Sequence, residues 1–345
     1  MACTKIIEYR FSYLQTQGFA DMSRIREIKE LLLLIALGGM IGFTTHSVAQ
    51  EDLQVVTSIK PLHSIVSAVM SGVGEPKLII PGFQSPHTHV LRPSNMRTLQ
   101  NPNVVFLIEE SCEASMGAAT KSLDENIEVI QLMKADGIEL VRWAEDSHQE
   151  SDDDNEDEPE ITSHRDLSMF DHHIWLDPLN AIVMTREVAR VLSEQFEEHA
   201  EVFSNNADSF ISKVEDLIER LTERYDAATV SLKPFIVYHD GYQSFEHRFG
   251  LDGLTRSFLK GEYTPGAKHI QELQKQITDL KIECVFTEPQ FDDDFVDSLQ
   301  DRANLKIHTL DPLGATLDAG PDMYIELLEN LSTSIIDCLT DDDDS

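Results

Sequence analysis

Residues Phe203–Leu221, "FSNNADSFISKVEDLIERL", separate two sets of strand-like runs and indicate one long helix. Apolar residues recur there at steps of three and four, which places them on a single face of a helix: Phe203, Ala207, Phe210, Val214, Leu217 and Leu221. No Gly or Pro interrupts the chain between Pro178 and Pro234. We therefore expect a stiff helical connector over residues 201–232, unlike a Gly-rich hinge.

Apolar runs of strand length lie on both sides of this helix. The runs are "LQVVTSI" (53–59), "KLII" (77–80), "NVVFLI" (103–108), "IEVIQL" (127–132), "FIVY" (235–238), "IECVFT" (282–287) and "LKIHTL" (305–310). They alternate with helical periodicity, which predicts parallel sheets covered by helices on both faces. The expected fold class is α/β, with an amino-terminal lobe (50–200), the linking helix (201–232), a carboxy-terminal lobe (233–340) and an acidic tail (341–345).

Acidic residues dominate the charge of the 345-residue chain, whose formal net charge is −35. Much of the excess lies in "EDSHQESDDDNEDEPE" (145–160) and in the terminal "DDDD" (341–344). Blocks of like charge repel themselves, so we expect a disordered acidic loop over about 145–170. Nucleic acid is excluded as a partner, because phosphate binding requires clustered Lys and Arg.

The first 49 residues have the pattern of a secretory signal peptide. Arg24, Arg26 and Lys29 precede the apolar run "LLLLIALGGMIGF", and "SVA" ending at Ala49 supplies small residues for cleavage after that position. The apolar run is short for a membrane span. We expect a processed chain without a permanent membrane anchor in an oxidising compartment.

Three cysteines remain after such processing, namely Cys112, Cys284 and Cys338. An oxidising compartment permits a disulfide among them. The residues alone leave every pairing open.

Polar side chains follow several of the predicted strands. His239 follows "FIVY", Asp311 follows "LKIHTL", Glu288 follows "IECVFT", and His87 lies in the loop after "KLII". Ligands of open α/β sheets bind outside the carboxyl ends of the strands, so these side chains are predicted to converge.

A further histidine comes from the segment "MFDHHIWLDP" (169–178). The apolar residues that follow it anchor this segment, and side chains alternate in extended backbone. We therefore predict His173 as the buried ligand and His172 as the loop-facing residue. Three histidines with one carboxylate suit Zn²⁺ in tetrahedral geometry, and binding should weaken as pH falls through the histidine range.

Six ordered segments resemble the periplasmic zinc-binding proteins of high-affinity zinc ABC transporters, the ZnuA family in the metal-binding cluster of solute-binding proteins. The segments are "SPHTHVLRPSN" (85–95), "DHHIWLDP" (171–178), "VYHDGYQSFEHRFGL" (237–251), "YTPGAKHIQEL" (263–273), "CVFTEPQF" (284–291) and "HTLDPLGA" (308–315). The resemblance extends from about residue 53 to 339. It implies two lobes, a rigid helix between them and a metal site in the cleft.

The resemblance also assigns roles to residues of this chain. His87, His173 and His239 match the zinc-binding histidines, and Asp311 matches a carboxylate that completes the site in related members. In zinc members, water or an acidic residue elsewhere can take this fourth place, so Asp311, Glu288 and water stay open as the fourth ligand. Where some members have a Glu before the first histidine, this chain has Pro86. Glu288 is implied as a residue that orients a ligand or neutralises the cleft.

Two further features follow from the resemblance. It implies a disulfide between Cys284 and Cys338, with Cys112 outside the pair. It also places a His- and acid-rich loop at the acidic segment, where His148, His164 and His172 occur. This loop is either a site of weak, fast metal capture or a solvated linker.

Three functions are compatible with these residues. The first is a monomeric periplasmic protein that captures Zn²⁺ and delivers it to a membrane permease driven by a separate ATPase, since the chain lacks a GxxxxGK[ST] motif. The second is the same role for Mn²⁺ or Fe²⁺, which His239 disfavours. The third is a zinc hydrolase with an open fourth position, against which the absence of HExxH argues.

Overall fold

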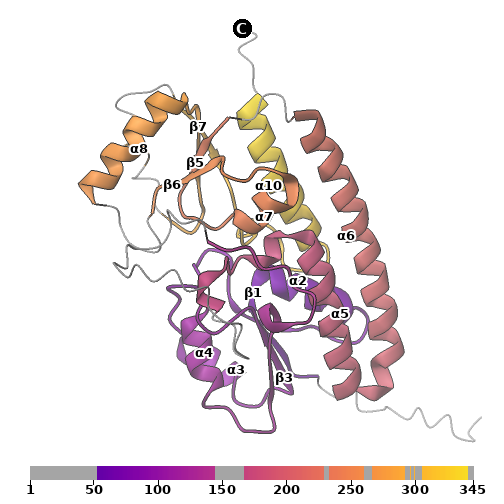
Figure 1. The fold of residues 1–345 in the computed structure, drawn as a ribbon. Coiled ribbons are helices and arrows are strands. Elements are labelled where there is room, and N and C mark those ends of the chain that lie inside the picture. Colours follow the sequence, from indigo (N-terminus) through magenta and orange to yellow (C-terminus); the bar gives the residue numbers. More distant parts are fainter. Residues whose placement is uncertain are drawn as a thin grey trace, which may run out of the picture. The chain divides into compact units, whose positions relative to one another are not determined.

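The computed structural model describes residues 53–143, 167–228, 233–259, 266–291 and 305–340, together with residues 296 and 299. It contains two four-stranded parallel sheets (Figure 1). The first consists of β1 (Val55–Ile59), β2 (Lys77–Ile80), β3 (Val104–Leu107) and β4 (Glu128–Gln131). The second consists of β5 (Phe235–Val237), β6 (Thr255–Ser257), β7 (Cys284–Thr287) and β8 (Lys306–Thr309).

The two sheets have the same strand order. The orders are β2-β1-β3-β4 and β6-β5-β7-β8, and every pair is parallel. In both sheets the order reverses between the first and third strands, and such a switch point opens a crevice at the carboxyl ends of the strands. Each lobe therefore offers one crevice in which loop side chains can meet a ligand.

Helices cover these sheets, as the α/β prediction requires. They are α2 (Lys60–Val69), α3 (Pro93–Thr98), α4 (Ala114–Thr120), α5 (Pro178–Gln195), α6 (Ala200–Ala228), α7 (Gln243–Phe249), α8 (Ala267–Leu280) and α10 (Met323–Thr340). Short 3₁₀ turns are η1 (Leu132–Lys134), η3 (Leu167–Met169), η4 (Ile174–Leu176) and η5 (Glu197–His199). No helix in the described part of the chain has the length and apolar character needed to cross a bilayer.

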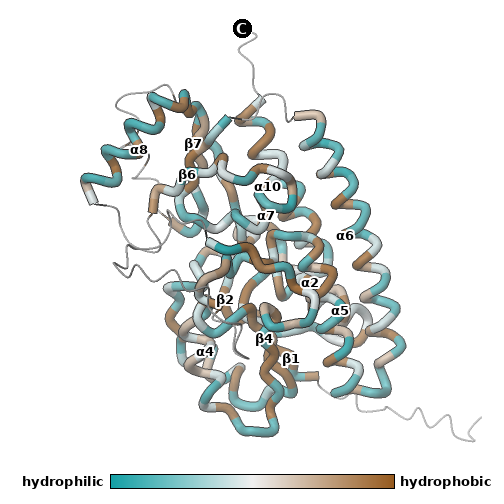
Figure 2. The backbone as a smooth tube through the Cα atoms, viewed as in Figure 1, coloured by the Kyte–Doolittle hydropathy of each residue, from teal (hydrophilic) through white to brown (hydrophobic). Residues whose placement is uncertain are grey.

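Helix α6 is the long connector predicted from the sequence. The described part of this helix extends from Ala200 to Ala228. All six residues of the predicted apolar stripe are buried. Figure 2 shows apolar and polar segments alternating along it. The helix packs against α2 and α5 of the first lobe and against α7 and α10 of the second. It thus joins the lobes along its length rather than at a point.

The predicted strands are all present, and one strand was missed. β1 and β3 are buried along their whole length, as continuous apolar runs between two helical layers require. β6, with the sequence Thr-Arg-Ser, is only half-buried and pairs with β5 alone. A short polar edge strand carries no periodic apolar signal, which explains why the sequence did not predict it.

The loop after β8 is fixed to the first lobe by buried hydrogen bonds. The Lys60 ammonium donates to the Gly314 carbonyl at 2.6 Å, and Trp175 Nε1 donates to the Pro312 carbonyl at 2.8 Å. Burial lowers the pKa of Lys60, while the nearby Asp311 carboxylate acts in the opposite direction. These bonds hold one side of the lobe interface in a defined position.

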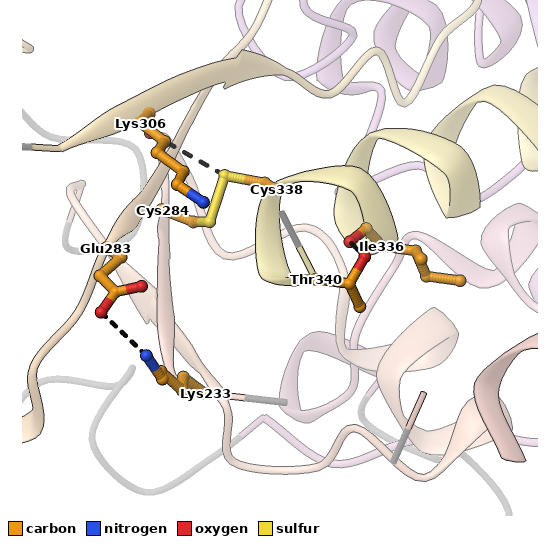
Figure 3. Close-up of a disulfide and its surroundings, with 7 residues drawn as sticks. All are labelled: Lys233, Glu283, Cys284, Lys306, Ile336, Cys338 and Thr340. Carbon is orange, nitrogen blue, oxygen red and sulfur yellow. Dashed lines mark hydrogen bonds and ion pairs between the residues drawn. A yellow bond between two sulfur atoms is a disulfide. The ribbon is translucent and has the colours of Figure 1, made fainter. Parts of the chain in front are cut away.

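A disulfide joins Cys284, at the start of β7, to Cys338 in the last turn of α10 (Figure 3). Their Cα atoms are 6.0 Å apart, and both residues are buried. The pairing implied by the resemblance is therefore present, and Cys112 lies outside it. The bond attaches the carboxy-terminal helix to the second sheet.

Glu113 is a fully buried carboxyl group that makes the stability of the fold depend on pH. Its Oε2 accepts a hydrogen bond from the Ile108 amide at 2.7 Å, and burial raises the pKa of Glu113 to about 7. The folded protein therefore retains a proton that the unfolded chain releases between about pH 4.5 and 7. In that window this group should lower the free energy of unfolding by about 1.4 kcal/mol per pH unit as pH rises.

The variant Glu113→Gln should lack this contribution. We expect it to be more stable than the unchanged chain at pH 8, and to lose that advantage at pH 4.5. Chemical denaturation of both proteins at the two pH values measures the difference. An identical difference in unfolding free energy at pH 4.5 and pH 8 would refute the assignment.

Candidate metal centre

The structure brings three predicted ligands together from three separate loops. His87 lies in the loop after β2, His173 precedes η4, and His239 follows β5. His173 Nε2 lies 3.2 Å from His87 Nε2 and 3.2 Å from His239 Nε2. Among the described residues, this is the only group of three or more His, Cys, Asp or Glu side chains whose ligand atoms all lie within 4.8 Å of one another.

Each imidazole of the group has a hydrogen-bond acceptor at its other nitrogen. His87 Nδ1 lies 3.1 Å from the Cys112 carbonyl, His173 Nδ1 lies 2.7 Å from Asp171 Oδ1, and His239 Nδ1 lies 2.7 Å from Glu288 Oε1. A carbonyl and two carboxylates can only accept, so each Nδ1 carries the proton. The three rings thus turn their Nε2 atoms toward the same point, and a neutral ring with its proton on Nδ1 offers the Nε2 lone pair to a metal.

Three converging imidazole nitrogens can hold a metal ion between them. In a tetrahedral zinc site with Zn–N bonds of about 2.0–2.1 Å, neighbouring nitrogens are about 3.3 Å apart. The two 3.2 Å separations match that spacing. The donor set and its geometry thus fit Zn²⁺, which neutral imidazole nitrogen binds well.

The environment of His87 favours the neutral ring. Burial, followed by the proximity of His173 and His239, holds the pKa of His87 well below its ordinary value. His87 therefore stays available as a ligand at pH values where an exposed histidine is already protonated. Metal binding still has to compete with protons as pH falls, because the ligand must be neutral.

Asp171 connects the centre to the second lobe. It is fully buried, and its Oδ1 accepts bonds from the amide (3.0 Å) and Nδ1 (2.7 Å) of His173. Its Oδ2 accepts bonds from the amide (2.9 Å) and hydroxyl (2.6 Å) of Ser244, at the start of α7. Burial opposes ionisation, but His173 and these hydrogen bonds lower the pKa of Asp171 to about 2.

Glu288 is the corresponding carboxylate in the second lobe. It is buried directly after β7, and Oε1 accepts the proton of His239 Nδ1. The buried Tyr242 hydroxyl also interacts with this carboxylate, and burial followed by this negative charge raises the pKa of Tyr242 well above its ordinary value. Glu288 therefore contacts a proposed ligand rather than the metal position itself, the arrangement expected for a residue that orients a ligand.

Gly241 is required by the close approach of the histidine rings. A Cβ atom at this position would lie 2.4 Å from His239 Nε2 and 3.1 Å from His173 Nε2. Any larger residue would displace a ring from the group. The pocket around the three histidines is completed by side chains from both lobes, namely Ser85, Pro86, Trp175, Glu288, Gln290, Phe291, Pro312 and Leu313.

The structure does not bring Asp311 into the histidine group. Its carboxylate accepts longer hydrogen bonds from the Leu313 amide (3.2 Å), the Thr316 amide (3.3 Å) and the Gln290 side chain (3.1 Å). Asp311 thus stabilises the turn that supplies one wall of the pocket.

Of the three histidines predicted for the acidic loop, the structure describes His172 alone. His172 lies apart from the group, with Nε2 3.4 Å from the Ser111 hydroxyl, and is more exposed than its neighbour His173. His148 and His164 lie outside the described residues, as do the predicted signal peptide and acidic tail.

The sequence interpretation missed three contributors to the site. The Cys112 carbonyl is a backbone group and carries no side-chain signal. Asp171 stands in the quoted "DHHIWLDP", where its position two residues before His173 offered a signal. Gly241 in "HDG" offered another, because glycine next to a predicted ligand often permits a close approach.

Comparisons with known proteins agree with this geometry. A sequence model of ZnuA, described as zinc-uptake complex component A, periplasmic, matches residues 55–338. The high-affinity zinc uptake system protein ZnuA of Brucella abortus is 37 % identical over 328 residues, covering 89 % of this chain and 98 % of the relative. The protein of the same name from Haemophilus ducreyi is 30 % identical over 320 residues, covering 90 % and 99 %.

Solved structures share the fold at lower sequence identity. A crystal structure of ZnuA superposes with a TM-score of 0.69 at 20 % identity, covering 83 % of this chain and 98 % of that one. The periplasmic zinc-binding protein TroA from Treponema pallidum gives a TM-score of 0.68 at 18 % identity, covering 83 % and 98 %. Together with the sequence matches, these findings establish that the chain belongs to the ZnuA family of periplasmic zinc-uptake components.

Proposed function

We propose that this chain captures Zn²⁺ with high affinity in the periplasm and delivers it to the permease of a zinc ABC transporter. One observation carries the proposal: the Nε2 atoms of three histidines converge, and His173 Nε2 lies 3.2 Å from each of the other two, close to the spacing of a tetrahedral zinc site. The names of the relatives support the role of such a site in zinc uptake.

The proposed ligands are His87, His173 and His239. Their hydrogen-bonded carboxylates, Asp171 and Glu288, supply two negative charges that balance the charge of the ion. Asp311 stays a predicted fourth ligand, and its weak hydrogen bonds in the pocket wall are compatible with a shift toward the ion. Water is the alternative occupant of the fourth position.

A nitrogen-rich centre argues against the other metals. Mn²⁺ and Mg²⁺ favour oxygen ligands, whereas this group presents imidazole nitrogen from both lobes. A hydrolase needs a general base that reaches a metal-bound water. Asp171 and Glu288 each accept the Nδ1 proton of a proposed ligand, a role that supports a binding protein over an enzyme.

Processing and partners complete the proposal. A signal peptide over residues 1–49 would export the chain, leaving a periplasmic monomer with lobes over 50–200 and 233–340. The permease and its ATPase would be separate chains. For the acidic loop over about 145–170 and its histidines, weak metal capture and a purely solubilising role both stay open.

The function can be tested by zinc uptake in cells. A strain without its own periplasmic zinc-binding protein should regain growth in zinc-depleted medium when it expresses this chain together with the cognate transporter. A variant with His87, His173 and His239 replaced by alanine should not restore growth. Equal growth with the triple variant at equal periplasmic protein levels would contradict the proposal.

Asp171→Asn provides a sharper test of how the centre is built. Both Asp171 oxygens accept from N–H or O–H groups, so the asparagine NH₂ would face a donor in either orientation. We expect zinc affinity to fall about 10- to 100-fold. Competition titration measures this, with the exposed Asp208→Asn as the matched control. Unchanged affinity accompanied by lower thermal stability would show that Asp171 acts on folding alone.

A further inference from the structure

One segment of this acidic chain has a reversed charge balance. The chain has 62 Asp and Glu residues against 27 Lys and Arg, yet no acid occurs between Glu75 and Glu109. The exposed side chains of Arg92 and Arg97 lie within that interval. Neither guanidinium group pairs with a carboxylate in the part of the chain that the structure describes.

The same segment exposes large apolar side chains. Phe83 is 58 % exposed, Val90 77 % and Met96 40 %. Helix α3, which carries Met96 and Arg97, buries none of its residues. Aromatic residues, Met and Arg are enriched in protein interfaces, whereas Asp and Glu are depleted, so the composition of residues 83–97 is that of a docking surface.

The proposed docking surface is continuous with the metal centre. The segment contains His87, and Ser85 and Pro86 line the pocket. Hydrogen bonds that connect this stretch to other parts of the described chain include the His87 Nδ1 bond to the Cys112 carbonyl, the Asn95 amide bond to the Ile79 carbonyl and, just before the segment, the Gln290 amide bond to the Gly82 carbonyl. A partner that binds this segment therefore contacts the wall of the pocket and holds the chain that carries one proposed ligand.

We propose that residues 83–97 dock onto the transporter permease. The surface of the permease that they contact would be partly apolar and acidic. The proposal rests on the proposed function in zinc uptake. The remaining surface, with its large excess of carboxylates, would repel an acidic partner, whereas Arg92 and Arg97 would attract it. Docking there would also allow the permease to displace His87 and so release the ion.

Two double variants test the surface without touching a proposed ligand. Arg92→Glu/Arg97→Glu reverses its charge, and Phe83→Ser/Met96→Ser removes apolar contacts. The matched controls are Arg186→Glu, an exposed arginine on α5, and Leu280→Ser, which is 38 % exposed on α8. All are made in the chain from Gln50, and zinc affinity is measured first to verify an intact centre.

Binding of the zinc-loaded proteins is then measured on phosphatidylcholine–phosphatidylglycerol vesicles with and without the reconstituted permease and ATPase. We expect each double variant to bind the permease at least about tenfold more weakly and to restore less zinc uptake, with unchanged zinc affinity. The controls should behave like the unchanged chain.

Three results would overturn the proposal. Double variants that bind the permease and restore uptake like the controls would place docking elsewhere. Equal, charge-dependent binding to vesicles without permease would identify lipid headgroups as the ligand. A shift of the unchanged chain to a dimer that both double variants abolish would identify a second copy. Failure of the unchanged chain to restore uptake would instead contradict the proposed function itself.

Discussion

Replacing His173 by alanine should weaken zinc binding about a thousandfold, equivalent to about 4 kcal/mol. This residue is central to the group, because its Nε2 lies 3.2 Å from the Nε2 of both His87 and His239. Without it, only two converging nitrogens remain, and the buried Asp171 carboxylate loses its principal partner. Competition titration with a chromophoric chelator measures the change.

Two comparisons separate loss of the ligand from loss of the fold. His199→Ala, in η5 and away from the pocket, should leave affinity unchanged. The thermal transition of metal-free His173→Ala should still be cooperative. If it is not, His87→Ala serves instead, because the Nδ1 partner of His87 is a neutral carbonyl. Affinity within threefold of the unchanged chain for both folded variants would contradict the proposed ligand set.

Removing the disulfide should lower the free energy of unfolding by about 4 kcal/mol. The cysteines are 54 residues apart, and cross-linking a loop of that length restricts the unfolded chain by roughly this amount. The loop includes β8 and most of α10, so both elements should lose stability. Guanidinium denaturation of Cys284→Ala/Cys338→Ala, followed by circular dichroism, measures the loss.

A reductant supplies the matched control for this prediction. It should destabilise the unchanged chain by a similar amount and leave the double variant unaffected. Equal stability of the oxidised and reduced unchanged chain would contradict the prediction.

Much of the fold was predictable because its signals are local. The apolar stripe on α6 and the apolar runs of the buried strands require only periodicity. The sequence did not predict β6, because the three polar residues of this edge strand show no apolar periodicity. The positions of His87 and His239 followed from one rule, namely that loops at the carboxyl ends of parallel strands meet.

The remaining parts of the site depend on how the lobes pack. Asp171 and Ser244 are 73 residues apart, and their hydrogen bond exists only because η4 and α7 are neighbours in the fold. The Cys112 carbonyl acts through its backbone, so its residue type is uninformative. Asp311 stands at the end of a strand as predicted, yet the backbone amides of its own turn occupy its oxygens. Sequence position identified this residue but not the competing hydrogen bonds.

The centre draws on both lobes because each sheet supplies one histidine from a loop that follows a strand. His87 lies after the edge strand β2 of the first sheet, and His239 lies after the central strand β5 of the second. His173, buried beside Trp175, completes the group between them.

The most direct test is anomalous diffraction at the zinc absorption edge from crystals of the chain from Gln50 loaded with one equivalent of Zn²⁺. We expect a single strong peak about 2.0–2.1 Å from Nε2 of His87, His173 and His239. The same map would reveal whether Asp311 or water occupies the fourth position. A zinc peak away from these three nitrogens, with none between them, would contradict the central claim.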